Sequence, residues 1–327
     1  TVHGYTPTAA EALVPLLKNE GYNVVCTSSK KQKMMRLVKM LVTIYNNRKN
    51  SVALLAAYST NAFYFAVACS LLCRSLHIPY ITCLHGGNLP QRIKNSPRLC
   101  AQLFMNSFMN VAVSDYLKHH LQKKNWHCIV IKNPIEIKEY PFKQRTECSP
   151  TLFWLRSFHN IYNPQLALQI LQQLLLIYNN AKLIMIGPDK DGSFETCRQL
   201  SAKLNLHQHI EFTGLLQKQD WIRLSANYDF FINTSNFDNA PVSVAEAMAL
   251  GMLVVSTNVG GMKYMISHTE NGMLVPQGDA AGFAQVIDSL VHDAALAKKL
   301  SSHARITAEQ YDSNTIKNEW NKLLQHF

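Results

Sequence analysis

Helix-like and strand-like segments alternate along the whole chain, and this alternation limits the folds open to it more than any other feature. Apolar strands such as 23–28, 52–58, 79–85 and 182–187 are separated by stretches with helical periodicity, such as 9–22 and 60–76. Strands that alternate with helices are typical of a mostly parallel sheet covered on both faces. The sequence therefore predicts an α/β fold.

One polar, proline-containing segment interrupts this alternation. "KEYPFKQRTECSP", residues 138–150, has the composition of a linker. We therefore predict an N-terminal Rossmann-like domain over 1–142, a C-terminal one over 143–310, and a last helix over 311–327 that returns to the N-terminal domain. Two doubly wound domains facing across a cleft would bind a ligand at the carboxyl ends of their strands.

The first residues lack one expected element. "HGYTPT" has the appearance of a glycine-bearing turn between a first strand and a first helix, but no strand precedes it. We therefore expect that this sequence lacks the first strand of its N-terminal domain. No signal peptide is visible, and the longest apolar run, 62–73, is shorter than the roughly 20 residues of a spanning helix.

Cysteine spacing and net charge indicate the cellular compartment of the protein and the kind of partner that it binds. The eight cysteines include no C-x-x-C pair, which favours free thiols in a cytoplasmic protein. The net charge of +11 suits an anionic partner. No nucleic-acid recognition motif appears, so we expect no nucleic acid. Residues 28–40 combine basic and apolar side chains at helical spacing; they could contact an anionic membrane surface or form an ordinary helix with a solvated basic face.

The stretch "FDNAPVSVAEAMALGMLVVSTNVGG", residues 237–261, places two acids beside a predicted helix start. Asp238 lies in the loop before the helix, and Glu246 lies about two turns inside it. The helix N-terminus presents unpaired N–H groups that suit a phosphate, and the two acids suit sugar hydroxyls. The alternative interpretation is an N-capping Asp and a surface Glu.

This stretch, together with "NGMLVPQGD" and the order of segments, resembles the retaining glycosyltransferases of family 4, which have the GT-B fold. The resemblance implies a nucleotide-sugar donor, UDP- or GDP-linked, bound mainly by the C-terminal domain. It implies that Glu246 binds the donor ribose and that Asp238 contacts sugar hydroxyls. It also implies donor contacts from the helix start, namely Asn239, Ala240, Pro241 and Val242, and from Gly187 at the end of the strand 182–187.

The chain departs from the family pattern at several positions. The first acid is Asp238 rather than Glu, and Lys263-Tyr264 stand near Gly260-Gly261 where the family has Pro-Glu. The family places an Arg and then a Lys on the donor diphosphate. Arg156 matches the Arg, but Ile161 and Tyr162 stand where the Lys is expected.

The resemblance also extends to the N-terminal half. His85 and Gly86 lie at the carboxyl end of the predicted strand 79–85 and match a loop whose His lies by the donor sugar, and Gly4 matches a loop facing the donor phosphates. We therefore predict Asp238, His85 and Arg156 as catalytic residues.

The resemblance implies transfer of a hexose-type sugar, with retention, to a glycan or lipid-linked acceptor. We expect no cofactor and no metal, because no metal-binding pattern is visible. The alternative is a weakened or inactive nucleotide- or glycan-binding subunit of a glycan-assembly system. The expected location is cytoplasmic, with peripheral attachment to the inner face of the membrane as an option.

Overall fold

The computed structural model describes residues 9–27 and 32–327, with side chains from residue 13 onward. The chain forms two compact units. Unit 1 comprises residues up to Pro134 together with Ser313–Phe327, and unit 2 comprises Ile135–Asp312. Gly4 and residues 28–31 of the basic segment lie outside the described residues.

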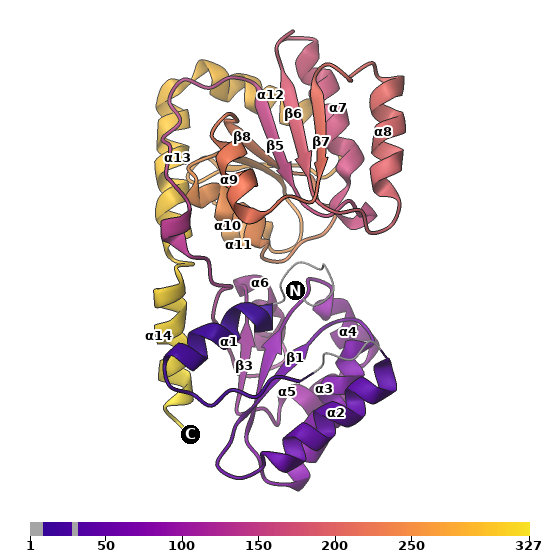
Figure 1. Cartoon of the computed structure of the whole chain (residues 1–327), viewed down its shortest axis with the longest axis vertical. Coiled ribbons are helices and arrows are strands. Elements are labelled where there is room, and N and C mark those ends of the chain that lie inside the picture. The colour runs from indigo at the N-terminus through magenta and orange to yellow at the C-terminus, as the bar shows by residue number, and fades with distance from the viewer. Residues whose placement is uncertain (1–8, 28–31) are drawn as a thin grey trace. The chain divides into compact units, whose positions relative to one another are not determined.

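Unit 1 is built around a parallel sheet with strand order β1-β2-β3-β4 in its described part (Figure 1). The strands are β1 (Ala53–Ala57), β2 (Tyr80–Leu84), β3 (Met109–Ala112) and β4 (Cys128–Val130). The helices are α1 (Ala9–Asn19), α2 (Lys33–Asn46), α3 (Ala62–Ser75), α4 (Leu89–Asn95), α5 (Pro97–Phe104), α6 (Asp115–Gln122) and α14 (Ser313–Leu324).

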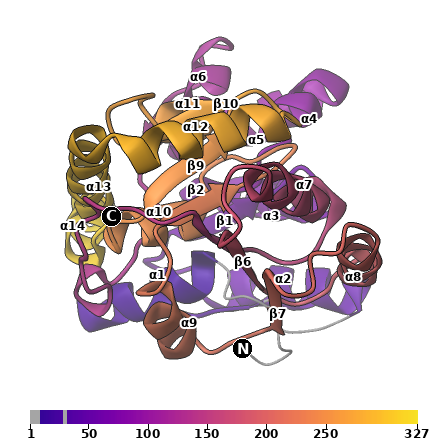
Figure 2. The ribbon, with the colours of Figure 1, turned by 90° about the horizontal axis from the view of Figure 1, so that it is seen from above.

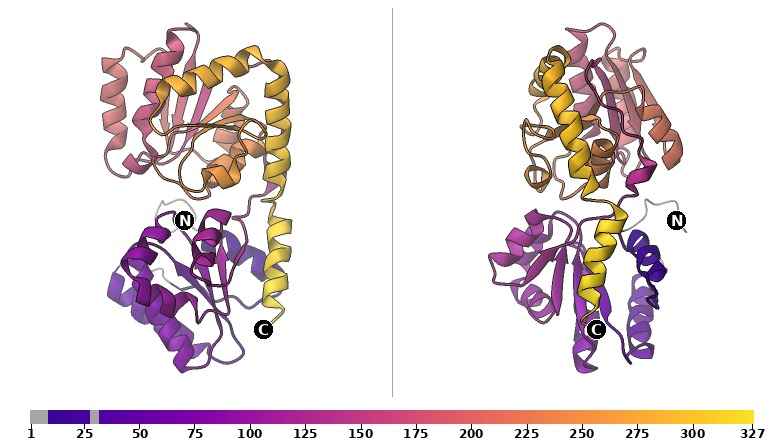
Figure 3. Two further views of the ribbon diagram at one scale, coloured as in Figure 1. Left: turned by 180° about the vertical axis from the view of Figure 1, so that it is seen from behind. Right: turned by 90° about the vertical axis from the view of Figure 1, so that its left-hand side faces the viewer.

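Alternate side chains of the unit 1 strands enter two different cores. Tyr80 and Leu84 of β2 pack with α3, α5 and α6 on one face, whereas Ile81 of β2 packs with α1 and α14 on the other. Figure 3 shows α1 and α14 beside each other on that second face, although they come from opposite ends of the chain. The period-2 alternation of a strand buried on both faces produces this arrangement.

Unit 2 has a larger parallel sheet with strand order β10-β9-β8-β5-β6-β7. Its strands are β5 (Thr151–Leu155), β6 (Lys182–Ile186), β7 (Ile210–Gly214), β8 (Phe230–Asn233), β9 (Leu253–Thr257) and β10 (Met273–Val275). Its helices are α7 (Pro164–Leu175), α8 (Ser193–Lys203), α9 (Lys218–Ser225), α10 (Val242–Ala249), α11 (Met262–Met265), α12 (Ala280–His292) and α13 (Ala294–Glu309), with short 3₁₀ turns η1 (Ile137–Glu139) and η2 (Asn160–Tyr162).

Helices also cover both faces of the unit 2 sheet. Helices α7 and α12 pack side by side on one face, where Trp154 of β5 is fully buried (Figure 2). Helices α10 and α13 pack together on the other face, where Phe153 is buried. The α/β architecture expected from the sequence is therefore confirmed.

Two local expectations differ from the structure. Residues 23–27 form no strand, because their backbone joins no ladder, although Val24 packs against the core between α1 and α14. The segment 138–150 is not a free linker but belongs to unit 2, which begins at Ile135 rather than after residue 142. Arg145 explains the second difference, because its buried guanidinium donates to the carbonyls of Leu250 and Tyr228.

Candidate active site

The strand order of unit 2 identifies one edge of the sheet as a natural binding position. The chain runs from β5 outward to β6 and β7, then returns to β8 on the other side of β5 and continues to β9 and β10. The loops that follow β5 and β8 therefore diverge between two adjacent strands, which is where open parallel sheets bind ligands. Arg156 directly follows β5, and Asp238 lies in the loop that follows β8.

Arg156 and Asp238 form an ion pair across this point. Nη2 of Arg156 contacts Oδ2 of Asp238, and the two side chains are only 15% and 11% exposed. The Ser235 hydroxyl donates to the same carboxylate oxygen over 3.2 Å, and the backbone N–H of Asn239 donates to Oδ1 over 2.9 Å. Two of the three predicted catalytic side chains thus meet in a largely dehydrated place, where charges interact strongly.

Tyr162 supports the guanidinium of Arg156 from one face. The guanidinium carbon lies 4.0 Å from the centre of the Tyr162 ring, which is a cation–π contact. The backbone around this ring is tied to the loop after β8, because the Thr234 hydroxyl donates to the Tyr162 carbonyl and the Asn236 N–H donates to the Ile161 carbonyl. The position at which the resemblance implies a Lys is therefore occupied by an aromatic ring that orients Arg156.

The Gly260-Gly261 turn packs directly against the backbone that carries Asp238. A Cβ on Gly260 would lie 2.0 Å from the Asp238 carbonyl oxygen, and one on Gly261 would lie 1.9 Å from the Asn239 carbonyl oxygen. The Gly261 N–H also donates to the Asp238 carbonyl over 2.9 Å. Because these two glycines have no side chain, the turn after β9 can pack closely against the backbone of the loop after β8. This close packing explains the Gly-Gly pair that follows the acidic stretch in the sequence.

Gly187 plays a similar part behind Arg156. A Cβ at this position would lie 1.8 Å from the Arg156 carbonyl oxygen. The Arg156 N–H donates to the Ile186 carbonyl over 3.0 Å, so the ends of β5 and β6 are in close backbone contact. Only glycine therefore fits at position 187, because any side chain there would collide with the backbone of Arg156.

Helix α10 begins beside the ion pair. Pro241 precedes its first residue, Val242, while Asn239 is buried. The first N–H groups of a helix have no intrahelical partner and favour a negative charge. Among the described residues, Nε of Arg156 and the hydroxyl of Ser243 are buried without a hydrogen-bond partner. Ser243, which sequence reasoning missed, thus adds a donor in the first turn of this helix.

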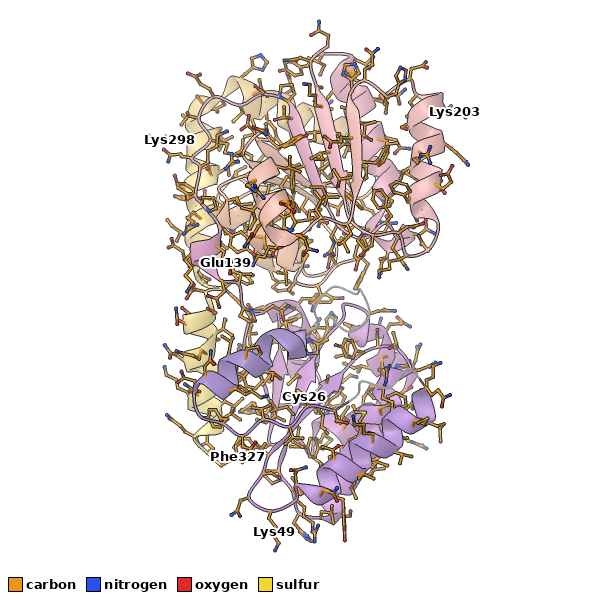
Figure 4. The ribbon with its side chains drawn as sticks, viewed as in Figure 1. Cys26, Lys49, Glu139, Lys203, Lys298 and Phe327 are labelled. Atoms are coloured by element: carbon orange, nitrogen blue, oxygen red, sulfur yellow. The ribbon has the colours of Figure 1, made fainter. Side chains whose placement is uncertain are left out.

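Glu246 lies one turn further along α10 and has a partner that sequence reasoning missed. The hydroxyl of Tyr140 donates to Oε1 of Glu246 over 2.7 Å. Burial raises the pKa of Glu246, while the Tyr140 hydrogen bond, Lys218 and Arg156 oppose that rise. Lys218 lies 4.6 Å from the centre of the Tyr140 ring and pairs with Glu139, which is labelled in Figure 4. In the sequence, Tyr140 appears only as a tyrosine within the predicted linker, so nothing there indicates that it contacts Glu246.

His85 and Gly86 belong to unit 1, where they follow β2. The His85 ring stacks on Tyr58 with its centre 5.3 Å away, and burial lowers the pKa of His85 to about 4. A neutral imidazole at pH 7 can exchange hydrogen bonds with a sugar hydroxyl but supplies no positive charge. Gly86 has a φ of 81°, which favours glycine at this turn.

The described residues contain no group of three His, Cys, Asp or Glu side chains that could hold a metal ion. All eight cysteines are free thiols. Within the described ranges, no helix is both long and apolar enough to cross a bilayer. Ser114, between β3 and α6, caps that helix by accepting a hydrogen bond from the Leu117 N–H.

Two named enzymes are similar in sequence to this chain. The N-acetyl-alpha-D-glucosaminyl L-malate synthase of Bacillus anthracis is 26% identical over 276 residues, which cover 78% of this chain and 70% of that protein. The N,N'-diacetylbacillosaminyl-diphospho-undecaprenol alpha-1,3-N-acetylgalactosaminyltransferase of Campylobacter jejuni is 25% identical over 230 residues, covering 66% of this chain and 58% of that protein.

Solved structures show the same fold at lower identity. HepE of Anabaena, in complex with UDP-glucose, superposes with a TM-score of 0.73 at 17% identity and covers 97% of this chain and 89% of its own. The chain therefore has the GT-B fold, as expected. Residues 136–307, about half of the chain and almost all of unit 2, match the family described as glycosyl transferases group 1. This chain thus belongs to the glycosyl transferases group 1 family and is a glycosyltransferase.

Proposed function

We propose that this chain is a retaining family 4 glycosyltransferase that moves a hexose-type sugar from a UDP-linked donor to a glycan or lipid-linked acceptor, in the cytoplasm and without a bound metal. The observation that carries the proposal is the meeting of Arg156, Asp238 and the start of α10 at the switch point of the unit 2 sheet. A UDP donor is favoured over a GDP donor by the solved structures of the similar protein HepE, which was crystallised in complex with UDP and with UDP-glucose.

The chemistry follows from where charge develops during transfer. The departing diphosphate gains negative charge while the anomeric carbon gains positive charge. The unpartnered Nε–H of Arg156 and the N–H groups at the start of α10 would donate hydrogen bonds to the diphosphate oxygens. Asp238 would stay paired with Arg156 and also accept from sugar hydroxyls, and Glu246 would accept from the ribose diol. A leaving phosphate oxygen would take the acceptor proton.

Calorimetry with UDP-, GDP- and ADP-sugars tests the donor assignment. We expect one nucleotide class to bind, and both Glu246→Gln and Arg156→Met to weaken that binding by about 10- to 100-fold, the range for losing a charge-assisted hydrogen bond. The matched controls are Glu309→Gln and Arg198→Met, which change exposed side chains of unit 2. Unchanged donor affinity in both site variants would refute the proposal.

The replacement of a Lys by Tyr162 favours a second candidate, a donor-binding subunit with little or no transfer activity. Tyr162 adds no positive charge for the leaving diphosphate, and it lies against Arg156, whose own charge is shared with Asp238. Slow donor hydrolysis by the purified protein separates the two candidates. Hydrolysis that disappears in Arg156→Met supports the transferase, whereas tight donor binding without hydrolysis supports the subunit.

A further inference from the structure

Helix α2 of unit 1 exposes a continuous stripe of large apolar side chains. Met34, Met35, Val38, Val42 and Tyr45 are each at least half exposed. At 3.6 residues per turn, these five positions fall within roughly a third of the helix circumference. Met40, Leu41 and Ile44 lie on the adjoining part of the circumference and pack against the unit 1 core. None of the helix residues is buried, so α2 is apolar on its outer face as well as its inner face.

The position of α2 makes this stripe available. It packs on α3, which itself packs on β1, so α2 forms an outer layer of unit 1 (Figure 1). Single exposed apolar residues are normal on a protein surface, but a continuous stripe of this kind marks an interaction site.

The charge around the stripe indicates the partner. Residues 21–114 contain eleven Lys and Arg and not one Asp or Glu, while the rest of the chain contains 21 of each sign. The whole net charge of +11 therefore arises from this part of unit 1. Lys33 and Lys39 lie on α2, and Lys49, which extends from the loop after it, is labelled in Figure 4. The apolar stripe thus shares its helix and the following loop with basic residues, in a part of the chain without Asp or Glu.

We propose that α2 docks unit 1 on an anionic lipid bilayer, with the stripe at the level of the lipid headgroups and the basic residues on the lipid phosphates. A helix with an apolar face and basic flanks binds such a surface through apolar burial and electrostatic attraction together. A nucleic acid would use the basic residues but leave the five apolar side chains in water. The docking does not depend on the transfer reaction, whereas its purpose, access to a lipid-linked acceptor, rests on the proposed function.

Vesicle co-sedimentation tests the proposal. We expect the full chain to bind phosphatidylcholine vesicles that contain phosphatidylglycerol, and to bind pure phosphatidylcholine vesicles at least tenfold less. Val38→Ser with Val42→Ser should weaken binding to the anionic vesicles at least tenfold. Lys33→Gln with Lys39→Gln and Lys49→Gln should weaken it about 100-fold, because each basic residue near an anionic surface contributes about fivefold. Higher salt should weaken it as well.

Matched controls keep the result specific to α2. Leu176→Ser with Ile177→Ser removes two exposed apolar side chains of unit 2, and Lys182→Gln with Lys203→Gln and Lys298→Gln removes three exposed charges there. Both controls should bind vesicles as the unchanged protein does. Thermal unfolding and donor calorimetry on each variant separate lost docking from lost fold and from failure of the proposed function.

Three outcomes would overturn the proposal. They are equal binding to neutral and anionic vesicles, vesicle binding that survives both α2 variants, and absence of vesicle binding. In the last case, a dimer that depends on Val38 and Val42 would assign the stripe to a second copy of the chain, and charge-dependent binding to single-stranded DNA would assign the region to nucleic acid.

Discussion

Three neighbouring residues fix the position of Arg156. Asp238 pairs with its Nη2, Tyr162 lies under its guanidinium, and Gly187 admits its backbone to the end of β6. Sequence reasoning found Arg156, Asp238 and Gly187 through the family resemblance. It could not find Tyr162 as a support, because nothing in the spacing shows that η2 folds back toward the loop after β8.

Tyr140→Phe should weaken donor binding and move its pH dependence. The hydroxyl of Tyr140 donates to Glu246 and opposes the burial that raises the pKa of that carboxyl. Without it, the pKa of Glu246 rises further, so the pH below which donor affinity falls should move upward. Calorimetry between pH 5.5 and 8.5 measures this shift. Tyr178→Phe, which removes a hydrogen bond to Asp288 instead, should leave the profile unchanged.

Glu246→Gln should stabilise unit 2 at neutral pH while it weakens donor binding. A carboxyl whose pKa is higher in the folded than in the unfolded protein favours unfolding above the folded pKa, and this effect disappears as the pH falls through the range between the two values. Urea unfolding at several pH values tests this. A gain in the free energy of unfolding at pH 7.5 that persists unchanged at low pH would contradict the assignment.

At the scale of elements, the turn after β9 and the loop after β8 are held together by direct backbone contacts. The order of strands and helices could be predicted from apolar periodicity, since most elements lie close to the expected ranges. The contact between Gly261 and Asn239 could not be predicted, because it depends on how two loops approach each other after the sheet has formed. The path of residues 138–150 was also missed, since the buried Arg145 that binds it to unit 2 looks like a surface residue in the sequence.

Gly261→Ala should impair the site through this contact. The φ of Gly261 is −84°, which alanine tolerates, so the effect would come only from the Cβ that meets the Asn239 carbonyl. We expect at least tenfold weaker donor binding together with a lower melting temperature. Gly278→Ala is the opposite control, because its φ is 77° and its Cβ would meet nothing within 4 Å. That variant should lose about 1 kcal/mol of stability and keep donor affinity.

At the scale of the whole molecule, unit 1 is completed by the last helix of the chain. Trp320 and Ile316 of α14 are buried with Leu17 of α1 and Ile81 of β2. Glu20, which directly follows α1, forms an ion pair with Lys317 and accepts a hydrogen bond from the side-chain amide of Asn321, so α1 and α14 are tied together. A return of the last helix to the N-terminal domain was expected, but the residues that it would contact could not be read from the sequence.

Trp320→Ala should destabilise unit 1 by about 3–5 kcal/mol, the usual effect of removing a large buried aromatic side chain. Donor binding resides in unit 2 under the proposed function, so affinity at low temperature should be preserved. Calorimetric unfolding with and without donor can separate the two effects. Phe327→Ala, which changes a half-exposed side chain, is the control. Loss of donor affinity in Trp320→Ala alone would contradict this separation.

The late position of α14 also bears on how the protein is made. Synthesis runs from the N-terminus at about 5–20 residues per second, and domains generally fold as units while the ribosome is still at work. Unit 2 is contiguous, so it can fold once Asp312 has emerged, whereas Ile81 and Val111 stay uncovered by α14 until residues 313–324 have emerged as well. Unit 1 therefore begins before unit 2 along the chain but is completed after it, and in that interval its uncovered apolar sheet face can be bound by chaperones.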